Sequence, residues 1–80
     1  MITSAQCRAA RGLLQWSQAQ LAEAAKVGIV TVRQFETGGA EPRRATLDVI
    51  ERALEAAGVQ FIPENGGGAG VRLAKPARPR

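Results

Sequence analysis

The spacing of apolar residues along the chain changes after Gly58. Before Gly58, apolar side chains recur every three or four positions in four segments, which is the period of an α-helix. These four segments cover about residues 4–13, 18–25, 29–37 and 44–57. After Gly58, residues 59–62 and 71–73 form short alternating runs around a glycine-rich stretch, which predicts a loose β-hairpin. We therefore expect a mainly α fold of four helices with a C-terminal β-hairpin.

Two stretches near the front of the chain carry the same signal for a helix start. Thr3 is followed three residues later by Gln6, and Ser17 by Gln20. In such a capping box the hydroxyl accepts a hydrogen bond from the backbone N–H of the later residue, whose side chain bonds back to the first. The boxes therefore predict where the first two helices begin.

Only about three residues, Lys26 to Gly28, separate the second helix from the third. Two short helices joined by such a turn form a helix-turn-helix unit, whose second helix can enter the major groove of DNA. A helical wheel of residues 29–37 places Thr31, Val32 and Phe35 on one side, which we expect to face inward. The opposite side carries Ile29 at its edge, together with Val30, Arg33, Gln34 and Thr37.

The residues on this outward side suit the edges of DNA bases. Arg33 and Gln34 can each form two hydrogen bonds with guanine and adenine, respectively, in the major groove. Ile29 and Val30 are apolar groups that suit the thymine methyl group. The outward side of the third helix is therefore the candidate base-reading surface.

Several residues also stand in a characteristic order: Arg11, Ser17-Gln18, Leu21-Ala22, Val27, Thr31-Val32, Phe35-Glu36, Gly38, Pro42 and Leu47 through Leu54. In this order and spacing, residues 3–57 resemble the lambda-repressor-like, Cro/XRE-type helix-turn-helix domain of bacterial and phage transcription regulators. The resemblance implies a four-helix bundle that binds double-stranded DNA sequence-specifically and regulates transcription, more often as a repressor.

The resemblance also implies roles for individual residues. The family's base-facing positions are matched by Ile29, Val30, Arg33 and Gln34. Its phosphate-contacting positions are matched by Gln18, Thr31, Arg43 and Arg44. Arg11 and Glu36 match a structural ion pair that ties the first helix to the third.

Two turn residues depart from the family pattern. Lys26 stands where the family favours glycine, because the backbone there is left-handed, and a side chain in that conformation costs about 1 kcal/mol. Gly28 replaces the usual Ser or Thr cap of the recognition helix, which loses roughly a few tenths of a kcal/mol. Both departures are expected to loosen the turn.

The charges are unevenly distributed along the chain. Residues 1–44 hold six basic and three acidic side chains, whereas residues 45–71 hold one basic and four acidic. The other four basic residues lie among the last nine, so residues 74–80 are expected to form a basic, disordered tail. The front half is therefore the part expected to meet a polyanion.

The composition argues against several other classes of protein. The chain has no His and a single Cys, Cys7, which excludes a disulfide framework, a His/Cys zinc site and a His-based catalytic triad. We therefore expect no enzyme, no metal site and no cofactor, and we interpret Cys7 as a small buried side chain. No apolar run approaches the roughly 20 residues of a membrane span. We expect a cytoplasmic protein that has no membrane partner and that lies on the nucleoid when it is bound to DNA.

These patterns divide the chain into three expected parts: a helix-turn-helix DNA-binding domain (1–58), a β-hairpin (59–73) and the basic tail (74–80). One recognition helix contacts few base pairs, so specific binding normally needs two copies on half-sites about 34 Å apart. We therefore expect a homodimer on a palindromic operator. The hairpin either forms the dimer contact or folds back over the first and fourth helices of its own chain.

Two alternative functions stay open at this stage. The protein could be the antitoxin of a toxin–antitoxin pair, which would repress its own promoter and also mask a toxin. It could instead be an interaction module that uses the fold without binding DNA.

Overall fold

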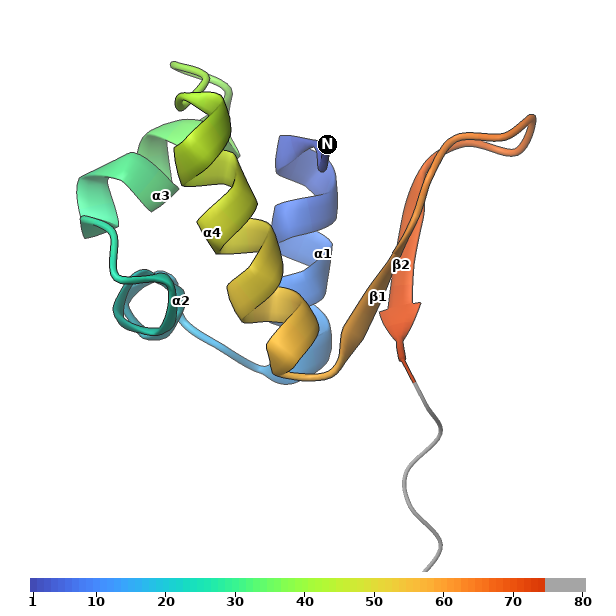
Figure 1. Ribbon diagram of the computed structural model, residues 1–80, viewed down its shortest axis with the longest axis horizontal. Coiled ribbons are helices and arrows are strands. Elements are labelled where there is room, and N and C mark those ends of the chain that lie inside the picture. Colours follow the sequence, from blue (N-terminus) through green and yellow to red (C-terminus); the bar gives the residue numbers. More distant parts are fainter. Residues whose placement is uncertain (75–80) are drawn as a thin grey trace, which may run out of the picture.

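The computed structural model describes residues 1–74, which form four helices followed by a two-stranded antiparallel sheet (Figure 1). The elements are α1 (Ser4–Leu14), α2 (Gln18–Ala25), α3 (Ile29–Thr37), α4 (Arg44–Ala56), β1 (Val59–Ile62) and β2 (Gly70–Leu73). The expected mainly α fold with a C-terminal hairpin is confirmed, and each expected element end agrees to within one residue. Apart from Ala74, the expected basic tail lies outside the described residues.

Both predicted capping boxes are formed. The Thr3 hydroxyl accepts a hydrogen bond from the backbone N–H of Gln6 at 3.0 Å, and the Gln6 amide oxygen accepts one from the N–H of Thr3 at 2.9 Å. Ser17 and Gln20 repeat this arrangement at the start of α2, with distances of 3.0 and 2.7 Å. These two local signals fix where α1 and α2 begin.

The turn between α2 and α3 has the backbone that the family pattern implies. Lys26 ends α2 in the left-handed conformation, with φ 59° and ψ 45°. Gly28 begins α3 with no side-chain hydrogen bond to the free N–H groups of that helix. The turn is therefore closed by the backbone, including a 3.0 Å bond from the Val27 N–H to the Ala22 carbonyl.

The helices enclose a small apolar core to which all four contribute. Its largest fully buried side chains are Leu21, Val32, Leu47, Ile50, Leu54 and Cys7. α2 packs against α3, and α4 lies beside both α1 and α2 (Figure 1). Within the described residues, no helix is long and apolar enough to cross a membrane.

One side of the hairpin packs against α1 and α4 of its own chain, as in the fold-back arrangement considered above; this packing does not involve the outer edge of β2. Val59 is almost completely buried, and Phe61 and Val71, which pair across the strands, pack against the core. The side-chain N–H groups of Gln6 donate to the carbonyl oxygens of Ile62 at 3.3 Å and Gly70 at 2.8 Å. Gln6 therefore joins α1 to both strands, while the glycine-rich loop projects away from the helices (Figure 1).

Candidate nucleic-acid interface

The packing of α3 leaves one side of this helix free. Val32 and Phe35 are buried against the other helices, and Thr31 is half-buried. Arg33 and Gln34 are exposed. The inward and outward sides therefore agree with the helical wheel.

Two apolar residues stand on the outward side of α3, in its first turn. Val30 is 54% exposed and Ile29 is 36% exposed, so Ile29 lies at the border of the core, as the wheel indicates. Ile29, Val30, Arg33 and Gln34 thus form one continuous helical surface, which we call the α3 surface. It combines hydrogen-bonding groups with apolar groups, the two kinds of contact that distinguish base pairs in the major groove.

A buried ion pair sets the position of α3 relative to α1. The Arg11 guanidinium donates two hydrogen bonds to the Glu36 carboxylate, from Nε to Oε2 and from Nη2 to Oε1, both at 2.7 Å. Arg11 also donates to the carbonyl of Trp16 at 2.9 Å, and Arg8 donates to the backbone carbonyl of Glu36. Because two parallel bonds fix orientation as well as distance, this pair holds the C-terminal half of α3 against α1.

Two further side chains converge on the same carboxylate. Gln18, the first residue of α2, donates to Glu36 Oε1 at 3.0 Å, and the Cys7 thiol donates to Oε2 at 3.2 Å. Burial would raise the pKa of the Glu36 carboxyl, but the hydrogen bonds from Arg11, Gln18 and Cys7 outweigh it and lower the pKa. Glu36 is therefore ionised and links α1, α2 and α3.

The cysteine in this cluster is held as a neutral donor. Burial, together with the hydrogen bond to Glu36 and the negative charge of that residue, raises the pKa of the Cys7 thiol to about 12. The sequence indicated only a small buried side chain at this position. It gave no signal that Cys7 and Gln18 share an acceptor, because the residues involved lie on three different helices.

Gln18 therefore makes a contact that the sequence did not predict. One of its two side-chain N–H groups is bonded to Glu36, which leaves one N–H and the amide oxygen unused by this bond. The expected phosphate contact of Gln18 is thus limited to a single donor. That donor lies at the N-terminal end of α2, where free backbone N–H groups also favour anions.

A shallow groove of about 470 Å³ runs between the α3 surface and the start of α4. It brings Thr31 and Gln34 of α3 next to Arg43, which directly precedes α4. Arg44 follows on the first turn of α4 and is exposed. Two of the expected phosphate contacts, Thr31 and Arg43, thus lie on the same groove as one expected base contact, Gln34.

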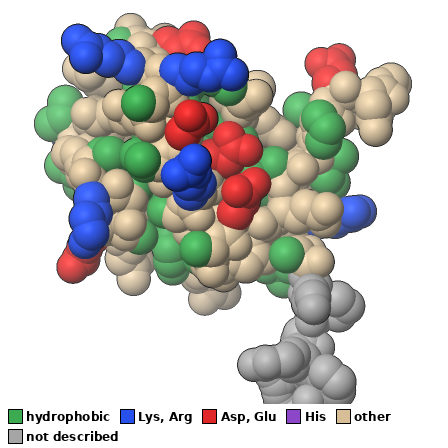
Figure 2. Space-filling model, viewed as in Figure 1, with side chains coloured by type: hydrophobic (Ala, Val, Ile, Leu, Met, Phe, Trp, Pro, Cys, Tyr) green, Lys and Arg blue, Asp and Glu red, His purple; other side chains and the backbone are tan. Residues whose placement is uncertain are grey.

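Basic side chains gather near the start of α4. Figure 2 shows two of them along the upper edge of the view, with an acidic one between them, where Figure 1 places the start of α4 and the segment before it. Acidic side chains surround a basic one over the exposed side of α4, a helix that carries Asp48, Glu51 and Glu55. A polyanion is therefore attracted to the start of α4 and repelled from its exposed side.

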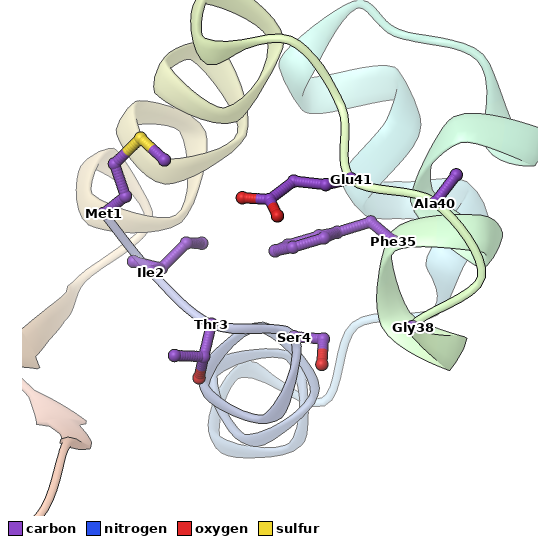
Figure 3. A pocket seen from close by; sticks show the side chains of 8 residues that line it. All are labelled: Met1, Ile2, Thr3, Ser4, Phe35, Gly38, Ala40 and Glu41. Carbon is purple, nitrogen blue, oxygen red and sulfur yellow. The ribbon is translucent and has the colours of Figure 1, made fainter.

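A second pocket, of about 440 Å³, lies between the start of α1 and the end of α3. Figure 3 shows Phe35 and Ile2 pointing into it, with the Glu41 carboxylate between them. Among residues 1–74, no basic side chain lines this pocket. It is therefore not part of the basic surface. Glu41 lines both this pocket and the groove beside Gln34, and its carboxylate points into this pocket (Figure 3).

Comparison with known proteins agrees with this geometry. The model of the Cro/C1-type helix-turn-helix family matches residues 8–59, which include the α3 surface, Glu36 with its partners Arg11 and Gln18, and the start of α4. A comparison with curated proteins gave no match.

Proposed function

The chain belongs to the Cro/C1-type helix-turn-helix family of DNA-binding regulators, and from this premise we propose that it is a sequence-specific transcriptional repressor that binds a palindromic operator as a homodimer in the cytoplasm. The observation that carries the proposal is the α3 surface, which presents Arg33 and Gln34 outward on a helix fixed from behind by Glu36.

In this proposal the α3 surface reads the bases. Arg33 donates two hydrogen bonds to guanine, and Gln34 forms a donor–acceptor pair with adenine. Ile29 and Val30 contact thymine methyl groups. Each bidentate pair contributes about 1–3 kcal/mol of discrimination against the wrong base.

Phosphate contacts fix the register of the helix on the duplex. The remaining N–H of Gln18 and the start of α2 bind the backbone on one side of the groove. Thr31, Arg43 and Arg44 bind it on the other side, assisted by the positive end of the α4 dipole. Repression then needs no chemical step, because a protein seated over a promoter excludes the polymerase.

The test is a selection of random duplexes on the purified full chain, followed by binding measurements on the selected site. We expect Arg33→Ala and Gln34→Ala each to weaken binding to that site by roughly tenfold to hundredfold and to relax the base preference at one position. Arg52→Ala, on the acidic side of α4, is the matched control and keeps both affinity and preference. A double variant R33A/Q34A with full operator selectivity would overturn the assignment.

The exposure of Val30 also favours a second candidate, an interaction module that binds another protein through the α3 surface. Gel shifts at two salt concentrations separate the two functions. A repressor binds its site specifically, and its affinity falls steeply with salt because phosphate contacts release counterions. An interaction module shows no specific shift at either concentration.

A further inference from the structure

The hydrogen-bond pattern of the hairpin shows which backbone groups it leaves outside. The Ala74 N–H donates to the Gly58 carbonyl at 2.7 Å, so this pair is a hydrogen-bonded pair of the ladder. Such pairs alternate with non-bonded pairs in antiparallel strands. The register therefore makes Gln60 and Arg72 the next bonded pair. The N–H and C=O groups of Val71 and Leu73 therefore point away from β1, at the outer edge of β2.

The two edges of the hairpin differ in what covers them. α1 packs against both strands, and β1 also lies against α4, with its first residue, Val59, almost completely buried. β2 lies on the side of β1 that faces away from α4 (Figure 1), and Leu73 is 48% exposed. Among residues 1–74, the outward backbone groups of Val71 and Leu73 make no hydrogen bond. The edge of β2 is therefore the open one.

This edge lacks the features that normally prevent pairing with another strand. Native edges are blocked by proline, by charged side chains or by bulges. β2 contains no proline, and its one charged side chain, Arg72, is turned onto its own hairpin, where Nε donates to the Gln60 amide oxygen at 2.9 Å. A two-stranded sheet is also marginal by itself and gains stability from further strands.

We propose that β2 pairs with β2 of a second copy of this chain, in an antiparallel register centred on Val71. Two-fold pairing suits this edge because each outward N–H of one copy meets a C=O of the other. The resulting four-stranded sheet is the subunit contact of the homodimer, so this pairing rests on the proposed function for its role on DNA.

Charge selects the register. A ladder centred on Arg72 would place two guanidinium groups directly opposite each other, which is destabilising. A ladder centred on Val71 places Arg72 opposite the partner's Gly70 and Leu73 opposite the partner's Ala69. The second register adds hydrogen bonds on both sides of Val71 and keeps the like charges apart.

The test measures the mass of the full chain in solution without DNA, by light scattering over a range of concentrations. The wild-type chain is expected at twice its 8.4 kDa mass. Leu73→Pro removes an outward N–H without removing a bond inside the hairpin, and proline is tolerated at that kind of edge position. We expect L73P to be monomeric with an unchanged circular dichroism spectrum, whereas the matched control Leu73→Val stays dimeric.

A wild-type chain that is monomeric at all concentrations, or an L73P variant that stays dimeric, overturns the pairing. Covalent dimers formed by R72C but not by V71C overturn the Val71-centred register; the native Cys7 is fully buried and does not compete. Binding to a duplex with a single half-site is measured separately. If L73P is monomeric and still binds the half-site, the pairing is supported; if no variant binds DNA, only the proposed function fails.

Discussion

At the scale of single residues, one carboxylate organises the DNA-binding half of the molecule. Glu36 is 2% exposed and accepts hydrogen bonds from side chains of α1 and α2 while standing on α3. Removing one partner of a buried ion pair leaves the other charge uncompensated, which costs about 3–5 kcal/mol. Removing the Glu36 carboxylate is therefore expected to lower the stability of the fold before it affects DNA recognition.

This expectation can be tested through pH. Because the folded pKa of Glu36 is lowered, its ionised form stabilises the fold above the pKa of the unfolded chain, about 4.3. That stabilisation is lost as the pH falls from there through the lower folded pKa. We expect Glu36→Gln to reduce the free energy of unfolding by about 3–5 kcal/mol at pH 7, and the difference from wild type to shrink below about pH 4.

Urea unfolding at a series of pH values measures both parts of this prediction. Glu55→Gln, an exposed carboxylate on α4, is the control and should stay within about 0.5 kcal/mol of wild type. A difference between E36Q and wild type that is constant from pH 7 to pH 3 would contradict a role for the ionised carboxylate.

At the scale of elements, the turn between α2 and α3 contains one residue in a strained backbone conformation, and a substitution can relieve that strain. Lys26 has φ 59°, a conformation that costs a residue with a Cβ about 1 kcal/mol and glycine almost nothing. We expect Lys26→Gly to raise the free energy of unfolding by up to about 1 kcal/mol. Ala24→Gly, two residues earlier inside α2, should lower it by about 1 kcal/mol. Thermal unfolding of both variants checks the signs, and equal effects would show that backbone conformation does not set them.

The elements also show which features the sequence could predict. The starts of α1 and α2 were predictable because a capping box needs only residues three apart, and the faces of α3 followed from its period. The convergence of Cys7, Arg11 and Gln18 on Glu36 depends on how three helices cross, and only the Arg11–Glu36 pair was anticipated, through the family resemblance. The period near Gly58 predicted the hairpin, but the side on which it packs was left open because Phe61 and Val71 suit either arrangement.

At the scale of the whole molecule, the hairpin is part of the core. Val59 is buried, and Phe61 and Val71 pack against the same core as the helices, so the helices and the hairpin share one core. A chain that ends at Gly58 loses these contacts. Since full burial of one such side chain contributes about 1.5–3 kcal/mol, we expect it to lose at least about 3 kcal/mol of its unfolding free energy.

Chemical denaturation of the shortened chain checks this value. Asn65→Ala, in the exposed loop of the hairpin, serves as the control and should leave the denaturation midpoint unchanged. A shortened chain as stable as the full one would show that the helices do not need the hairpin.

The hydrogen bonds of Gln6 to both α1 and the hairpin have a consequence for local opening of the structure. Its amide oxygen closes the capping box of α1, and its amide nitrogen holds the carbonyls of Ile62 and Gly70. The amide oxygen and the amide nitrogen belong to one rigid group, so breaking the hydrogen bonds of one displaces the other. The first turn of α1 and the far end of the sheet should therefore open together, as one cooperative unit. The amide protons in the first turn of α1 and those near Ile62 and Gly70 would then exchange with solvent together, although some sixty residues of chain lie between them.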